Sequence, residues 1–138
     1  PNGITVINDA YNANPDSMLS AMRTLAAFPA EGRKYIALGD MFELGETSHR
    51  EHRGIGRKAA ELGFDHVLFT GADMALAAKA YLAAQAEGQD REVHFASKAE
   101  LADRLRAELR PGDVLLIKGS RGMRMEEILD LLQRQEGR

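Results

Sequence analysis

Cysteine is absent from the 138 residues, so the chain can form neither a disulfide framework nor a thiolate metal site. No run approaches the ~20 apolar residues that span a bilayer, and no signal peptide opens the sequence. The formal net charge of −3 gives no general attraction to nucleic acid or to anionic membranes. These absences argue against nucleic-acid and membrane partners and fit a reducing compartment such as the cytoplasm.

Three familiar site motifs are also absent: the G-x-x-x-x-G-K-[ST] phosphate loop, the G-x-G-x-x-G dinucleotide fingerprint and the G-x-S-x-G nucleophile elbow. The chain alone therefore lacks recognisable machinery for holding a triphosphate and its magnesium ion. It begins Pro1-Asn2-Gly3, without an initiator methionine, and enters an aliphatic run at once. We expect residues 1–138 to form a single domain excised from a longer protein at a linker.

Five short aliphatic runs alternate with longer helical patterns. In order they are Ile4–Ile7, Tyr35–Leu38, His66–Thr70, Glu92–Phe95 and Val114–Lys118. Most are continuously apolar, as expected for strands that are buried on both faces of a parallel sheet. The alternation predicts an α/β fold, a Rossmann-like three-layer α/β/α sandwich with a mainly parallel sheet of five to six strands.

Capping signals predict where the helices begin and end. Side chains typical of helix starts are Asn14 before Pro15, Ser48 with Glu51, Asp73, and Ser97 with Glu100. Glycines typical of helix ends are Gly63 and Gly88. A last helix is predicted from about Met123 to Gln135.

Polar and glycine-rich segments follow the predicted strands, where open α/β sheets bind ligands. They cover residues 8–15, 39–46, 71–73 and 118–124. The opposite edge has ordinary connectors such as Ala30-Glu31-Gly32 and Gln89-Asp90-Arg91. The asymmetry predicts a ligand site at the edge formed by the carboxyl ends of the strands.

The first of these segments suits ribose hydroxyls or phosphates. Asp9 can accept hydrogen bonds, while Asn12 and Asn14 can both donate and accept them. The segment leads into a helix amino terminus, which favours anions. Asn14 has an equally good structural explanation, because asparagine is a common helix cap.

The last segment carries positive charge at a strand end. Lys118 supplies a point charge and Ser120 a hydroxyl group, and Arg121 and Arg124 can each grip a carboxylate or phosphate with two bonds. The alternative is a solvated helix start.

Two histidines, His49 and His52, lie three residues apart near a predicted helix start. A metal site is conceivable there, but no further ligand cluster accompanies them, so we interpret both as part of a polar helix face. Tyr11 and Phe42 are candidates for ligand contact because both lie in loops of the predicted site.

Three segments resemble one family closely. They are Asp9–Ser17, Leu38–Glu46 with His49 and His52 after it, and Val114–Glu126. They resemble the three carboxy-terminal-domain motifs of the UDP-N-acetylmuramoyl-tripeptide–D-alanyl-D-alanine ligases, within the Mur ligase superfamily. The resemblance covers nearly the whole chain in order. Sister ligases usually carry a histidine near the position of Ala13.

The resemblance implies a cytoplasmic enzyme of peptidoglycan synthesis with three domains: one for the UDP-sugar, a central P-loop ATPase, and this one. ATP would phosphorylate the terminal carboxylate of the muramoyl tripeptide, and the amine of D-alanyl-D-alanine would then displace phosphate. ATP and Mg²⁺ would be held mainly by the central domain, the partner onto which this domain closes. The isolated domain is expected to be inactive and to hold no metal.

The resemblance also implies roles for individual residues. The ATP-binding set would be Asp9, Tyr11, Asn12 and Asn14. The substrate-binding set would be Asp40, Glu43, His49, Lys118, Ser120, Arg121 and Arg124. No residue of this domain is certain to be catalytic, and Lys118 is the candidate for stabilising charge in the transition state.

Three other interpretations compete. A phosphorylation-switched receiver domain has the same strand–helix order, but the third strand ends Phe69-Thr70-Gly71, without the aspartate that would accept phosphate. A sister ligase, such as a folylpolyglutamate-type enzyme, should carry a histidine where Ala13 stands. A stand-alone nucleotide-binding α/β module stays open.

Overall fold

The computed structural model describes residues 3–85 and 92–136. Within them a five-stranded sheet has the order β1-β5-β2-β3-β4, and every neighbouring pair is parallel. The strands are β1 (Thr5–Asp9), β2 (Lys34–Leu38), β3 (His66–Thr70), β4 (His94–Phe95) and β5 (Val114–Lys118). The predicted α/β fold with a mainly parallel sheet is therefore confirmed.

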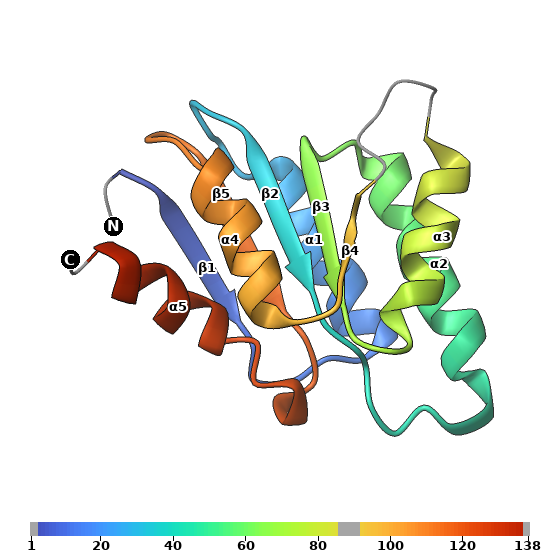
Figure 1. The fold of residues 1–138 in the computed structure, drawn as a ribbon. Helices are drawn as coiled ribbons and strands as arrows, with labels where there is room; N and C mark the ends of the chain where they lie inside the picture. The colour runs from blue at the N-terminus through green and yellow to red at the C-terminus, as the bar shows by residue number, and fades with distance from the viewer. Residues whose placement is uncertain (1–2, 86–91, 137–138) are drawn as a thin grey trace.

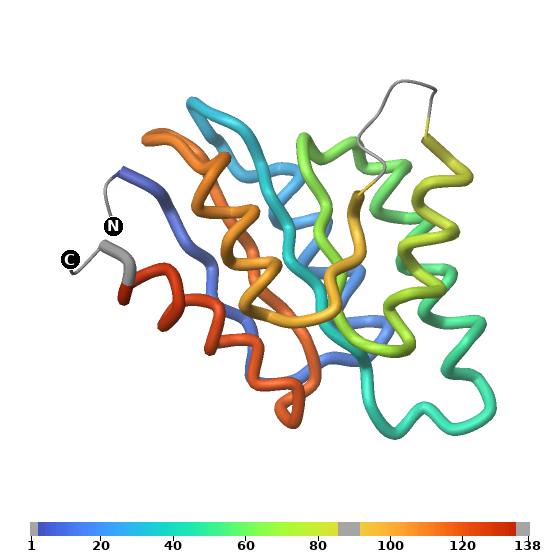
Figure 2. Tube along the Cα trace, viewed as in Figure 1, coloured from blue at the N-terminus to red at the C-terminus, as the bar shows by residue number. Residues whose placement is uncertain are grey.

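Helices cover both faces of this sheet, as Figure 1 and the trace in Figure 2 show. One face carries α1 (Pro15–Ala27), α2 (Ser48–Leu62) and α3 (Met74–Ala84), and the other carries α4 (Lys98–Glu108) and α5 (Glu127–Glu136). Two short 3₁₀ helices, η1 (Gly45–Thr47) and η2 (Arg121–Met123), lie in the loops after β2 and β5. The result is the three-layer sandwich that the alternating pattern predicts.

The central strands carry continuous apolar runs because the two faces of the sheet bury separate cores. Ile36 and Leu38 of β2 pack among side chains of α1, α2 and α3. Tyr35 and Ala37, which alternate with them, pack among side chains of α4 and α5. Successive strand residues point to opposite faces, so a strand covered on both sides needs a continuous hydrophobic run.

Two of the predicted helix caps are confirmed. Asn14 accepts a hydrogen bond from the backbone of Ser17 at 2.8 Å at the start of α1, and Ser97 accepts one from Glu100 at 3.1 Å at the start of α4. Gly63, in the left-handed conformation at φ 71°, ends α2 as expected.

The other two predicted caps are wrong. Ser48 lies inside the first turn of α2, because the 3₁₀ helix η1 leads directly into it. The hydroxyl group of Thr47, at the cap position, makes no capping bond and donates instead to the carbonyl oxygen of Leu44 at 2.9 Å. Asp73 precedes α3 but also makes no capping bond. The cap of α3 comes from Asp40 in the loop after β2, as described below.

Other boundaries differ from the predictions as well. The last helix begins at Glu127 rather than Met123, because η2 and the left-handed Arg124 intervene. The fourth strand is confined to His94–Phe95. Helix α3 ends at Ala84. Three earlier expectations, at residues 1–2, Gly88 and 89–91, lie outside the described residues.

No helix among residues 3–85 and 92–136 combines the length and the apolar character that crossing a membrane requires.

Substitution by alanine should have opposite effects on stability at two glycines of α2, Gly54 and Gly56. A Cβ at Gly56 would collide with the carbonyl oxygen of Ala77 in α3, whereas a Cβ at Gly54 would meet no atom within 4 Å. Gly56→Ala should lower the free energy of unfolding by about 1–3 kcal/mol, because the two helices must separate. Gly54→Ala should raise it by about 0.5–1 kcal/mol, because alanine favours the helix. Urea unfolding of both variants measures the difference, and similar effects at both positions would contradict the close approach of α2 to α3.

Candidate functional site

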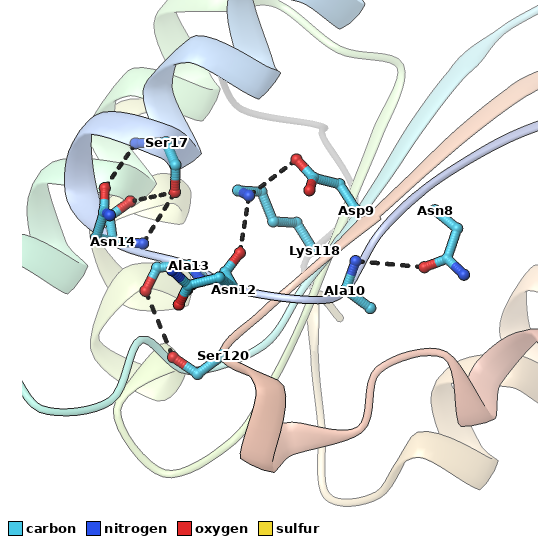
Figure 3. A network of polar contacts seen from close by, with 9 residues as sticks. All are labelled: Asn8, Asp9, Ala10, Asn12, Ala13, Asn14, Ser17, Lys118 and Ser120. Atoms are coloured by element: carbon cyan, nitrogen blue, oxygen red, sulfur yellow. Dashed lines mark hydrogen bonds and ion pairs between the residues drawn. The ribbon is translucent and has the colours of Figure 1, made fainter.

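The loops after β1, β2 and β5 meet at the carboxyl edge of the sheet, and Ser120 joins all three. Its hydroxyl group accepts a hydrogen bond from the backbone of Phe42 at 2.7 Å. The same hydroxyl group donates to the carbonyl oxygen of Ala13 at 3.4 Å (Figure 3). Its own backbone N–H donates to the carbonyl oxygen of Asp40 at 2.9 Å. Ser120 is buried, so its hydroxyl acts first as a link between loops.

Lys118, the last residue of β5, points its ammonium group back to the loop after β1. Nζ lies 2.8 Å from Oδ2 of Asp9 and 2.9 Å from the carbonyl oxygen of Asn12 (Figure 3). The lysine is only 2% exposed, and a buried charge requires such partners. The Asp9 side chain is 45% exposed, so this carboxylate stays accessible to a ligand although it is paired.

The two asparagines of the first loop are both used in local structure. The side-chain oxygen of Asn12 accepts from the backbone of Ala13 at 2.9 Å. Asn14 forms a reciprocal capping box with Ser17, whose hydroxyl oxygen accepts from the Asn14 backbone at 3.0 Å. The capping explanation of Asn14 is therefore confirmed, and its contact with nucleotide stays a prediction.

A hollow of about 520 Å³ opens beside the Lys118–Asp9 pair. Its apolar part is made by Ile7, Ala21 and Leu116, and its polar part by Asn8, Asp9, Tyr11, Asn12, Ser17, Ser20, Thr24 and Lys118. Apolar walls with a few convergent polar groups are typical of small-molecule sites. Ser20 and Thr24 lie on the α1 side of this hollow and were missed, because hydroxyl groups on a helix carry no sequence signal.

The two exposed large hydrophobic side chains of the described residues both lie in the site loops. Tyr11 is 72% exposed and Phe42 44%. The guanidinium carbon of Arg121 lies 5.1 Å from the Tyr11 ring centroid, a cation–π contact between the first and last loops. Phe42 packs on Gly122, where a Cβ would stand only 2.6 Å from its ring. Both rings are thus exposed in loops of the site, and their contact with a ligand stays a prediction.

Asp40 is buried, and its carboxylate is occupied by the start of α3. Oδ1 accepts from the backbone of Met74 at 2.8 Å and Oδ2 from that of Asp73 at 3.3 Å. A Cβ at Gly71 would collide with the same carboxylate, and Gly71 has φ 114°. The structure shows that these oxygens anchor the loop to α3. The predicted contact of Asp40 with substrate stays a prediction.

Two residues of the predicted substrate-binding set have strained backbones. Glu43 has φ 63° and Arg124 has φ 51°, and they are the positive-φ residues other than glycine within the described ranges. Such conformations cost about 1–2 kcal/mol per residue and concentrate at functional sites.

Lys98 holds the turn that contains Arg124. Its ammonium group donates to the carbonyl oxygen of Met123 at 2.8 Å and pairs with Glu127. The hydrogen bond from Lys98 holds the pKa of the Glu127 carboxyl below its usual range. Sequence reasoning missed Lys98, because a single lysine directly after a helix cap carries no distinguishing pattern.

The two histidines differ in their surroundings. His49 is exposed at the start of α2. His52 is fully buried, and its Nε2 accepts from the backbone of Met41 at 3.0 Å. The expectation of a polar helix face is therefore wrong for His52. Among the described residues no group of three or more His, Asp or Glu side chains is arranged to hold a metal ion.

The cap at α3 yields a direct stability test. Asp40→Ala removes both acceptors for the first N–H groups of α3 and should lower the free energy of unfolding by about 1–2 kcal/mol. Asp73→Ala, at the position that the sequence suggests for the cap, should cost less, since it removes only the bond from Ser48. Urea denaturation of the two variants measures the difference. Equal losses, or a larger loss for Asp73→Ala, would show that Asp40 is not the cap.

Comparisons with known proteins agree on one family. Residues 1–121 match the family described as Mur ligase, glutamate ligase domain. The chain is similar to the UDP-N-acetylmuramoyl-tripeptide–D-alanyl-D-alanine ligase of Bacillus subtilis, with 36% identity over 132 residues that cover 95% of this chain and 28% of that protein.

Solved structures agree with the sequence match. A MurF crystal structure from Acinetobacter baumannii matches with a TM-score of 0.81 and 30% identity over 96% of this chain and 29% of that one. The MurF ligase of Thermotoga maritima in complex with ADP matches with a TM-score of 0.79 and 25% identity, with the same coverage. The chain thus spans less than a third of each of these relatives.

Proposed function

This chain belongs to the Mur ligase family, and we propose that it is the carboxy-terminal domain of a cytoplasmic UDP-N-acetylmuramoyl-tripeptide–D-alanyl-D-alanine ligase. Its substrates would be ATP, the UDP-linked tripeptide and D-alanyl-D-alanine. The observation that carries the proposal is the junction at Ser120, where the loop suited to nucleotide and the loops suited to the dipeptide share one buried hydroxyl group. A domain built in this way brings two ligands to one edge.

We assign the nucleotide to the side of this edge formed by β1 and α1. The half-exposed carboxylate of Asp9 can accept hydrogen bonds from ribose hydroxyl groups, and the Tyr11 ring offers a face for a base. Asn12 can donate from its amide NH₂ group while its oxygen holds the loop. The adjacent hollow has the polar and apolar character of a nucleoside site. Triphosphate and Mg²⁺ would be held by the central domain.

The dipeptide is assigned to the loops after β2 and β5. Arg121 and Arg124 are exposed and can bind its carboxylate, while Glu43 and His49, also exposed, lie on the side where its ammonium group would enter. Lys118 is buried and paired, so its charge would act on the reaction without direct contact. In a site closed to water such a charge stabilises the tetrahedral intermediate that forms when the amine attacks the acyl phosphate.

A stand-alone nucleotide-binding module is the second candidate, favoured by the hollow beside Asp9. The two candidates differ in what the chain does without other domains. As the carboxy-terminal domain of a ligase, residues 1–138 alone should neither ligate nor hydrolyse ATP, and isothermal titration should detect at most weak ATP binding. Tight, magnesium-dependent binding by this chain would favour the stand-alone module.

In the full-length ligase, substitutions in the two halves of the site should separate kinetically. Asn12→Ala should chiefly raise the KM for ATP, and Arg121→Ala the KM for D-alanyl-D-alanine. Each shift should be roughly ten- to a hundredfold, because a charge-assisted bond contributes about 1.5–3 kcal/mol. Steady-state kinetics with one substrate varied at a time measures both. Lys118→Ala should lower kcat itself if its charge is felt mainly in the transition state.

Matched variants separate ligand binding from folding. Asn14→Ala should also raise the KM for ATP, but it removes a helix cap, which costs about 1 kcal/mol of stability. Asn12→Ala removes no helix cap and loses only the bond to the Ala13 backbone within the loop. Arg57→Ala replaces an exposed arginine of α2 outside the site loops and should leave both KM values unchanged. The division of the site is refuted if Asn12→Ala and Arg121→Ala perturb ATP and dipeptide equally while both proteins unfold normally.

A further inference from the structure

His52 is a fully buried polar side chain to which the proposed function gives no role. Its Nδ1 lies 2.7 Å from the carbonyl oxygen of Ser48, one turn earlier in α2. Its Nε2 lies 3.0 Å from the backbone nitrogen of Met41. A carbonyl oxygen can only accept and a backbone amide can only donate. The imidazole is therefore neutral, with its proton on Nδ1 and a lone pair on Nε2 that is directed at Met41.

The bond to Met41 falls in the middle of the segment 39–44 after β2, which we call the substrate loop. The residues on either side are held by β5 and the loop after it: Gly39 donates to Lys118 at 2.8 Å and Phe42 donates to Ser120 at 2.7 Å. Met41 is held instead from α2. His52 thus supplies the second support of the substrate loop, from a different helix layer.

The first turn of α2, which holds the His52 ring, is itself bonded to the start of α3. Ser48, whose carbonyl oxygen holds the imidazole, donates from its hydroxyl group to Asp73 at 3.0 Å. Asp73 adjoins the start of α3, which is capped by Asp40 from within the substrate loop. The first turn of α2 therefore cannot shift without disturbing α3 and the loop together.

The substrate loop, held by these bonds, exposes the side chains of Phe42 and Glu43. Glu43 has a left-handed backbone at φ 63°, and a strained conformation of this kind persists only where its surroundings determine it. The described contacts that precede it are the bonds to Met41 and Phe42. Loss of the bond between His52 and Met41 would leave the backbone at Glu43 free to relax to an ordinary conformation.

We propose that His52 is a positioning residue, which fixes Phe42 and Glu43 for the incoming dipeptide through its bond to Met41. The proposal rests on the proposed function, because the ligand of the substrate loop is taken from it. His52 does not touch the substrate, and its effect is transmitted by the backbone.

The test compares three variants in the full-length ligase. His52→Leu fills a similar space without an acceptor, His52→Gln keeps an acceptor at the end of the side chain, and His66→Gln is a control at the opposite edge of the sheet, where His66 stacks on Tyr35. His52→Leu should raise the KM for D-alanyl-D-alanine about tenfold and that for ATP less than about twofold. His52→Gln should recover most of this loss, and His66→Gln should match the wild type.

Hydrogen exchange followed by mass spectrometry tests the bond between His52 and Met41 without requiring catalysis. The peptide that contains residues 39–44 should exchange faster in His52→Leu than in His52→Gln, and at the wild-type rate in His66→Gln. Equal kinetic losses in both His52 variants, or equal effects on ATP and dipeptide, would show that the ring only fills the core. If the unaltered ligase does not use the dipeptide, the proposed function fails, while the exchange rates still decide whether His52 holds Met41.

Discussion

The arrangement of the site depends on the burial of one positive charge. Lys118 ends β5, an interior strand between β1 and β2, and its ammonium group is removed from water. An unpaired charge there would be very costly, and it is paired by Asp9, the register neighbour of Lys118 at the end of β1, and by the carbonyl oxygen of Asn12 in the loop after β1. The adjacent Ser120 then connects that loop with the one after β2. The three loops are therefore held in one geometry before any ligand arrives.

Buried polar groups of the site hold its loops, and exposed groups are available for contact with a ligand. The buried side chains of Ser120, Asp40 and His52 accept hydrogen bonds from backbone N–H groups and so hold the loops in place. Tyr11 and Arg121 are exposed in the loops of the site. Satisfied polar networks inside a protein specify geometry, because a mispaired group is costly there. A rigid frame with exposed contact groups fits the proposed ligase domain, which would present the same surface each time it closes on its partner.

The sequence predicted the fold, and the edge where the loops meet, because burial on both sheet faces leaves continuous hydrophobic runs and because polar segments follow them. It also predicted the local caps at Asn14 and Ser97, whose partners lie three residues away. It failed at Asp40, which caps a helix 33 or 34 residues further along the chain, and at His52, which looks like a surface residue by its neighbours. Such long-range bonds leave no local pattern, and neither does the left-handed backbone of Arg124.

The position of β5 between β1 and β2 has a consequence for the order of folding. Asp9 and Lys118 touch although 109 residues separate them, and within the described residues β1 pairs with no strand except β5. Contacts between such distant residues form slowly, because a long loop must be closed before they contribute. During synthesis β1 has no strand to pair with until β5, near the end of this domain, has left the ribosome. The loop after β1 can therefore reach its final geometry only late in folding, after β5 has paired with both β1 and β2.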